Sequence, residues 1–304
     1  MTSFLNALPG AISQGLIWGV MAIGVYITYK VLDIADLTVD GSICTGAAVC
    51  TMLLLGGQSP WLALLCAVLA GVLAGAVTGL LHVGLGIPPI LTGILTQMVL
   101  WSVNLKLLGK ANQALPARTT PVLLSQMDVG GALPVLLGFC VVLVALLVLF
   151  FGTELGCALR ATGCNPVMSR AQGVNTGLMK VIGLALSNGV VALSGALLCQ
   201  YQGYTDVNMG RGAVVIGLAA VVIGQAVLGR RGGRMAVQLG GVILGAVIYY
   251  IVYQVIIFAG FDTDLLKMFS AVVVAVFLGA PHVKAQLKAH SRSKKGDSGH
   301  AENE

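Results

Sequence analysis

The stretch from Gly41 to Leu105 reads GSICTGAAVCTMLLLGGQSPWLALLCAVLAGVLAGAVTGLLHVGLGIPPILTGILTQMVLWSVNL and contains no Asp, Glu, Lys or Arg. An α-helix rises about 1.5 Å per residue, so about 20 apolar residues cross the hydrocarbon core of a bilayer. This one stretch therefore holds roughly three crossings. Its apolar runs are continuous rather than alternating, which excludes a transmembrane β-barrel. The stretch predicts a polytopic, all-α membrane protein.

The composition of the whole chain supports the same class. The 304 residues are 57% hydrophobic and 9% charged, whereas soluble domains carry about 25% charged residues. The formal net charge of +6 is a signal of membrane topology, because no basic patch is interleaved with aromatic residues as nucleic-acid binding would require. We expect nine transmembrane helices, at residues 8–29, 40–56, 60–84, 88–105, 132–152, 180–200, 211–228, 235–258 and 265–283.

Two of the expected helices, 40–56 and 211–228, are short and rich in glycine. Each follows a polar run, at residues 33–40 and 204–211, and each precedes a short turn and longer helices. One half would begin outside the membrane and the other inside. This order is typical of an inverted repeat with discontinuous helices near the bilayer midplane. The alternative is that both polar runs are ordinary loops that cap ordinary helices.

The chain reads as one transmembrane domain over residues 1–283. Its first half is 8–131, a polar loop occupies 153–180, and the second half is 180–283; a basic tail, 284–304, has the composition of a disordered segment. If the 153–180 loop is cytoplasmic, most Lys and Arg residues lie inside, as the positive-inside rule requires. The N-terminus is then outside and the C-terminus cytoplasmic. We counted Arg211 among the residues outside.

The polar loop reads TELGCALRATGCNPVMSRAQGVNTGLMK from Thr153 to Lys180. We expect a short helix from 154 to 159, a break at Gly163, Asn165 and Pro166, and a second turn over 168–172. Arg160 and Arg170 offer planar guanidinium groups to the carboxylates of a partner. The segment is thus predicted to be a surface bound by another protein. The alternative is a positively charged anchor without a partner.

Several kinds of site are missing from the sequence. It contains no Gly-x-x-x-x-Gly-Lys-Ser/Thr loop for nucleotide phosphates and no spacing typical of metal ligands. The seven cysteines are scattered and are expected to be packing residues. The spacing of Gly71, Gly75 and Gly79 predicts close helix packing. The protein is therefore expected to be no enzyme, to hold no metal, and to use an energy source that it does not itself contain.

A solute pathway would use polar side chains that are costly to expose to lipid. Positions 96, 97, 101 and 104 recur at helical spacing, so they share one helix face. Helix N-termini near residues 41 and 212 are expected to favour a solute carboxylate. Each side chain has an alternative role as a helix cap or as a bond between helices. The candidates are Thr38, Asp40, Ser42, Thr96, Gln97, Trp101, Asn104, Asp206, Asn208 and Arg211.

The chain resembles a known family in three places. Gly156, then Arg160-Ala161-x-Gly163-x-Asn165, then Ala171-x-Gly173 resembles the cytoplasmic coupling loop of ATP-binding cassette (ABC) importer permeases of the branched-chain amino acid and ribose type. Asp36-Leu-Thr-Val-Asp40-Gly41-Ser42, followed by Gly46-Ala47-Ala48, resembles the first-half signature of that branch. Gly109-Lys110-Ala111-Asn112 is similar to a subset that includes tryptophan-type uptake permeases. Cys164 departs from the pattern, because the family often has a polar or acidic residue there.

The resemblance implies a permease subunit in a bacterial cell membrane that moves a small polar solute, an amino acid, inward by alternating access. Its implied partners are a dimer of cytoplasmic ATPases that use ATP and Mg²⁺, an extracytoplasmic substrate-binding protein or lipoprotein, and a second permease copy or paralogue. The chain itself would bind no cofactor and no nucleic acid, only solute and membrane lipid. The coupling residues would be Glu154, Gly156, Arg160, Ala161, Gly163, Asn165, Arg170 and Gly173. The alternatives are an autonomous ion-coupled transporter and a scaffold subunit that transports nothing.

Overall fold

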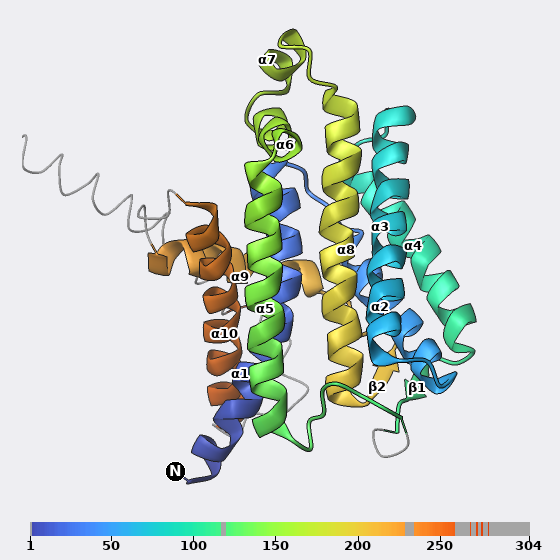
Figure 1. The fold of residues 1–304 in the computed structure, drawn as a ribbon, viewed down its shortest axis with the longest axis vertical. Helices are drawn as coiled ribbons and strands as arrows, with labels where there is room; N and C mark the ends of the chain where they lie inside the picture. Colours follow the sequence, from blue (N-terminus) through green and yellow to red (C-terminus); the bar gives the residue numbers. More distant parts are fainter. Residues whose placement is uncertain are drawn as a thin grey trace, which may run out of the picture. The chain divides into compact units, whose positions relative to one another are not determined.

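A computed structural model describes residues 2–116, 120–228 and 234–258, with four isolated positions beyond them. Residues up to Val255 form one unit, and the contacts given below lie within it. The elements are α1 (Thr2–Tyr26), the π-helix η1 (Ile27–Val31), α2 (Val39–Leu55), α3 (Pro60–Gly84), α4 (Pro89–Leu108), β1 (Asn112–Ala114), α5 (Val129–Gly152), α6 (Glu154–Cys164), α7 (Pro166–Ala171), α8 (Thr176–Gln202), β2 (Tyr204–Asp206), α9 (Ala213–Leu228) and α10 (Met235–Phe258) (Figure 1).

Six helices in the described ranges are long and apolar enough to cross a membrane: α1 with η1, α3, α4, α5, α8 and α10. Two shorter apolar helices, α2 and α9, accompany them. The polytopic all-α class is thereby confirmed. The predicted ninth helix, 265–283, lies almost wholly outside the described residues, as does the whole tail 284–304.

Helices α5 and α8 begin earlier than the sequence pattern predicts, because a side chain caps each N-terminus. The carboxylate of Asp128 accepts a hydrogen bond from the Gly131 amide at 3.1 Å, so α5 begins at Val129 rather than at 132. The amide oxygen of Asn175 accepts from the Leu178 N–H at 3.1 Å, so α8 begins at Thr176 rather than at 180. Such caps satisfy backbone donors that the first helical turn leaves free.

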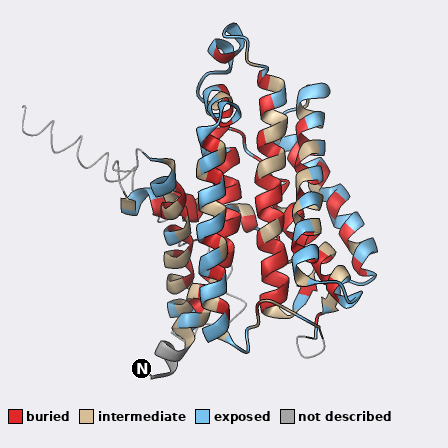
Figure 2. Cartoon of the chain, viewed as in Figure 1, coloured by how far each residue is buried: buried red, intermediate tan, exposed pale blue. Residues whose placement is uncertain are grey.

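Helix α8 lies at the centre of the described bundle and packs against α1, α2 and α3 (Figure 2). Three glycines of α3 make this packing possible. A side chain at Gly71 or Gly75 would meet the backbone of α8 at Asn188 or Leu184, and one at Gly79 would meet Val181 at 2.8 Å. The prediction of close helix packing from this spacing is confirmed. The outward faces of α3, α4 and α5 carry exposed leucine, isoleucine and valine, as lipid contact or subunit contact would require.

The sequence analysis missed a small antiparallel sheet. Strand β1 follows α4 and pairs with β2, which follows α8; Gln113 lies opposite Thr205. Each strand has only three residues, too few for a period-2 pattern to be recognised. The pair joins the two halves of the chain at one end of the bundle, while α6 and α7 lie at the other end (Figure 1).

Candidate functional site

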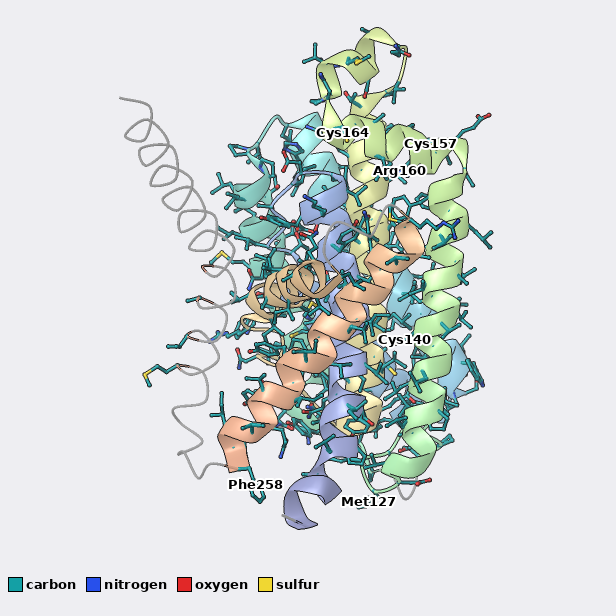
Figure 3. The ribbon with its side chains drawn as sticks, turned by 90° about the vertical axis from the view of Figure 1, so that its left-hand side faces the viewer. Met127, Cys140, Cys157, Arg160, Cys164 and Phe258 are labelled. Atoms are coloured by element: carbon teal, nitrogen blue, oxygen red, sulfur yellow. The ribbon has the colours of Figure 1, made fainter. Side chains whose placement is uncertain are left out.

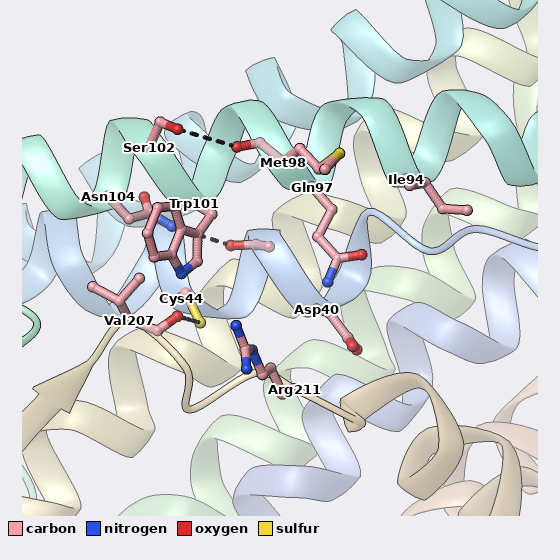
Figure 4. A pocket seen from close by; sticks show the side chains of 11 residues that line it. Asp40, Cys44, Ile94, Gln97, Met98, Trp101, Ser102, Asn104, Val207 and Arg211 are labelled. Carbon is pink, nitrogen blue, oxygen red and sulfur yellow. Dashed lines mark hydrogen bonds between the residues drawn. The ribbon is translucent and has the colours of Figure 1, made fainter.

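A cavity of about 520 Å³ lies between α2, α4 and the segment that joins β2 to α9. Figure 4 shows its side chains converging from these three parts of the chain. Five residues named as pathway candidates line it together: Asp40, Gln97, Trp101, Asn104 and Arg211. The remaining lining residues are Gly41, Cys44, Ile94, Met98, Ser102 and Val207.

Asp40 joins the two short helices. Its carboxylate oxygens accept hydrogen bonds from the backbone N–H groups of Gly212 and Val214, each at 3.0 Å. A carboxylate at this place satisfies free donors of the first turn of α9 and interacts favourably with the helix dipole. We expected this N-terminus to favour the carboxylate of a solute. Asp40 occupies that position instead.

Arg211 and Gln97 bring unpaired polar groups to the cavity. Within the described ranges, neither side chain makes a hydrogen bond or an ion pair. Arg211 lies across the cavity from Gln97 and Trp101 of α4 in Figure 4. The expectation that Arg211 lies on the outer side of the membrane stays a prediction.

Asn104 is fully buried, yet half of its amide lacks a partner. Its Nδ2 donates to the Gly41 carbonyl at 3.5 Å, the outer limit for a hydrogen bond. Its Oδ1 has no partner among the described residues. A buried acceptor left unpaired costs about 1–3 kcal/mol. The oxygen has no accessible surface, so neither water nor a ligand in the cavity reaches it in this conformation.

The α4 side of the cavity is apolar and open. Trp101 is 43% exposed and Met98 is 67% exposed. Trp101 makes no hydrogen bond within the described chain, so its indole N–H is also free. The described residues leave this side of the cavity uncovered.

Three pathway candidates lie outside the cavity, in a buried network. The hydroxyl of Thr38 lies 2.9 Å from that of Thr78, and Thr78 donates to Thr96 at 3.0 Å. Ser42 donates to the side-chain oxygen of Asn188 at 2.6 Å. These three candidates, Thr38, Ser42 and Thr96, bind helices to one another, which is the alternative role given for them above.

Asp206 and Asn208 also lie away from the cavity. Asp206 ends β2, and its carboxylate accepts from the Asn208 N–H at 2.7 Å and from the Asn112 side chain at 3.4 Å. The residue between them, Val207, lines the cavity instead. The Asp206 carboxylate and the Asn208 backbone therefore stabilise the turn that positions Arg211.

Asn188 and Asp36 complete the buried network, and neither was recognised as a partner of the other. Asn188 Nδ2 donates to Asp36 at 2.8 Å and to the Leu184 carbonyl at 2.9 Å. Asp36 also accepts from the Thr38 N–H at 2.9 Å. An asparagine within an apolar helix signals a partner, because an unpaired amide is costly there. The sequence cannot identify that partner, which is 152 positions away in the chain.

The 153–180 segment forms two short helices, with the break at one residue. Asn165 ends α6, and its side chain caps α7 by accepting from the Met168 N–H at 3.0 Å. Pro166 is the first residue of α7, where its missing N–H has no consequence. Gly163 was predicted to break the helix, and this is wrong. It lies inside α6, at a point where a larger residue would meet the Val31 carbonyl.

Three of the predicted coupling residues hold α6 in place. Gly156 packs against the backbone of Phe150 and Phe151, and Arg160 donates to the Phe151 carbonyl at 3.1 Å. Together with Gly163 they fix α6 against α5 and η1. Figure 3 shows Arg160 between Cys157 and Cys164 on this helix.

The surface of the segment is formed by other residues. The remaining candidates are exposed: Glu154, Ala161, Asn165, Arg170 and Gly173. Arg170 also donates to the Thr176 hydroxyl at 3.1 Å. The sequence analysis did not name Val167 and Met168 on α7, which are 77% and 60% exposed. Apolar residues within an otherwise polar loop were the sequence signal that could have indicated this surface.

Comparisons with known proteins identify the family of the chain. A family model described as the permease component of the branched-chain amino acid transport system matches residues 8–280. The tyrosine transport system permease protein of Clostridioides difficile is 37% identical over 93% of this chain and 94% of its own length. The fructose import permease protein of Bifidobacterium longum is 26% identical over 86% of this chain and 73% of its own length.

A third relative, the autoinducer 2 import system permease protein of Escherichia coli, is 28% identical over 67% of this chain and 60% of its own length. No solved structure matches the chain. The family decides against both alternatives left open by the sequence, the autonomous carrier and the scaffold that transports nothing. This chain belongs to the family of branched-chain amino acid transport system permease components, and it is the membrane-spanning permease subunit of a bacterial ABC importer.

Proposed function

We propose that this permease imports an amino acid through the cavity between α2, α4 and α9. The observation that carries the proposal is the convergence of Arg211, Gln97 and Trp101 on one cavity with polar atoms that the described chain leaves unpaired. The 37% identical tyrosine transport permease supports an amino acid as the solute. Sugar and autoinducer permeases are more distant relatives, at 26% and 28% identity.

The open α4 side of the cavity requires a cover. Unpaired polar groups are costly against acyl chains, so the cavity opens to water or to protein. We propose that a second permease copy or a paralogue packs on α4 and encloses the pathway between the two subunits. Exposed apolar residues around the opening, such as Met98 and Val99, suit such a contact.

Nine helices in two inverted halves form the complete domain in this proposal. Two packing relations support it. Helix α8 packs on α2 and α3, while α1 packs on α9 and, through Gly15 and Gly19, on α10. Exchanging α1 with α8, α2 with α9 and α3 with α10 converts one set into the other. The ninth helix, 265–283, then corresponds to α4, and 1–283 is one permease domain with the basic tail 284–304 after it.

The α6–α7 segment is proposed to bind a dimer of cytoplasmic ATPases. These subunits would use ATP and Mg²⁺, and the chain itself would bind no cofactor. Glu154, Ala161, Asn165, Arg170 and Gly173 would lie at the contact. Gly156, Arg160 and Gly163 would transmit force by holding α6 rigidly on α5 and η1. A short packed helix of this kind suits rigid-body movement between two states.

The orientation follows from this assignment. The N-terminus of α1 and the α6–α7 segment lie at opposite ends of the bundle in Figure 1. With α6 and α7 in the cytoplasm, the N-terminus is outside, the C-terminus is inside, and an extracytoplasmic binding protein or lipoprotein would dock at the β1–β2 end.

Reconstitution tests the proposed function directly. The permease, its ATPase and its binding protein would be placed in liposomes, and uptake of radiolabelled L-tyrosine would be followed with ATP inside or outside. We expect uptake only when ATP is on the side of α6 and α7. Uptake driven by an ion gradient without ATP, or ATP hydrolysis that never responds to any amino acid, would contradict the proposal.

A further inference from the structure

The cavity between α2, α4 and α9 carries opposite charges on one wall. Arg211 supplies a guanidinium with no hydrogen bond or ion pair within the described residues. Asp40 supplies a carboxylate whose oxygens face the N–H groups of Gly212 and Val214. A ligand with only a negative charge would be opposed by Asp40, and one with only a positive charge would be opposed by Arg211. The wall therefore suits a zwitterion.

The unpaired atoms divide into donors and an acceptor. Arg211 presents donors in a planar fork that matches a carboxylate. The Gln97 side chain lines the same cavity, and its amide oxygen is an acceptor with no hydrogen bond among the described residues. An ammonium group has donors and no acceptor, so it can satisfy this oxygen, which a carboxylate cannot do. The polar groups thus match both ends of an α-amino acid.

The rest of the cavity is aromatic and apolar. Trp101 presents an aromatic ring, and Met98 and Ile94 extend this apolar side along α4. Aromatic rings pair favourably by stacking, worth about 0.5–1.5 kcal/mol beyond area burial. The volume of about 520 Å³ lies within the 300–1,000 Å³ typical of small-molecule sites. A large side chain fits this space, whereas a small one would leave Trp101 without contact.

We propose that this cavity is a binding site within the permease for a zwitterionic aromatic amino acid, with Arg211 on the carboxylate, Gln97 on the ammonium and Trp101 on the ring. The proposal rests on the proposed function, since it refines the solute of the same pathway. The binding-site proposal also goes beyond the proposed function, because the permease would then select its solute itself and would not only accept what the binding protein delivers.

Binding of tritiated L-tyrosine to the purified permease–ATPase complex, without the binding protein, tests this site. We expect saturable binding that L-tryptophan and L-phenylalanine displace. Tyramine, which lacks the carboxylate, and 3-(4-hydroxyphenyl)propionate, which lacks the ammonium, should compete at least tenfold less well. Arg211→Gln and Trp101→Ala should each weaken binding at least tenfold, and Trp101→Phe should restore most of it.

Matched controls separate the site from general damage. Trp61→Ala removes a tryptophan that is 62% exposed on α3, and Lys110→Gln removes an exposed charge after α4; both should bind within twofold of the wild type. If Arg211→Gln fails to fold, Arg211→Lys keeps the charge, loses the fork and should still bind several-fold more weakly.

Two outcomes are distinguishable. A complex that imports L-tyrosine with ATP and its binding protein, yet shows no saturable binding alone or binds equally well in the Arg211 and Trp101 variants, overturns the site and leaves the proposed function standing. A complex that imports no amino acid at all overturns the proposed function.

Discussion

Two buried asparagines lie in neighbouring parts of the bundle and differ in how their hydrogen bonds are satisfied. Asn188 on α8 donates to Asp36 and Leu184 and accepts from Ser42, at 2.6–2.9 Å. Asn104 on α4 makes one bond at 3.5 Å, and its oxygen has no partner among the described residues. Both are fully buried. Residue type and burial therefore do not show how strongly a buried amide holds the bundle together, whereas its hydrogen-bond pairing does.

The largest effect is expected at Asn188. Asn188→Leu leaves the Asp36 carboxylate and the Ser42 hydroxyl without their side-chain partner in the core. The free energy of unfolding should fall by about 3 kcal/mol, because buried groups then keep their full desolvation cost. Unfolding of the purified permease in a denaturing detergent titration measures this. An unchanged midpoint would mean that the network is not the structural element described here.

The next largest loss of unfolding free energy is expected for Gly163→Ala. Its methyl group would meet the Val31 carbonyl, so α6 must move away from η1. Overpacking of this kind costs about 1–3 kcal/mol. Gly138→Ala on α5 is the matched control, because nothing lies near its added methyl among the described residues. The control should be neutral or slightly stabilising; equal losses in both variants would remove the special role of Gly163.

A smaller effect is expected at the tip of the coupling segment. Met168→Asp places a charge on an exposed apolar residue of α7 without touching the packing of α6. We expect the ATPase to bind about tenfold more weakly, as for an apolar contact at an interface, with unchanged stability of the isolated permease. Quantitative copurification measures this. Met127→Asp, at the opposite end of the chain's bundle, should leave the ATPase bound; loss in both variants would show a general defect.

The smallest effect is expected at Asp40. Asp40→Asn keeps one acceptor oxygen for two backbone donors and removes the charge near the α9 N-terminus. The loss should be about 1 kcal/mol, the usual value of a helix cap. Asp128→Asn, which keeps its single bond to Gly131, is the control and should lose less. A loss as large as that of Asn188→Leu would place Asp40 in the structural network.

Much of the helical architecture could be predicted from the lengths of the apolar segments alone. The helix 60–84 was predicted with its observed bounds, since Ser59 and Pro60 mark its start. The bounds of α5 and α8 required caps from Asp128 and Asn175, local signals that hydropathy ignores. The β1–β2 pair could not be predicted, because two three-residue strands separated by four helices carry no periodic pattern.

The candidate site was predicted as a set of polar residues and not as an arrangement. Helical spacing correctly placed Gln97, Trp101 and Asn104 on one face of α4. Sequence could not show that Ser42 turns to Asn188 while Asp40 turns to α9, because one residue of register decides which helix each side chain meets. The contacts of Arg211 depend on a turn between β2 and α9 that tertiary structure alone defines.

The measurement that tests the central claim most directly is a pair of values for Gln97→Leu: its unfolding free energy and its ATP-driven uptake of L-tyrosine in liposomes. Removing an amide that makes no hydrogen bond among the described residues should leave stability within about 0.5 kcal/mol of the wild type. Uptake should fall at least tenfold, because the solute loses its acceptor. Unchanged uptake, or a loss of stability like that of Asn188→Leu, would contradict the assignment of Gln97 to the solute pathway.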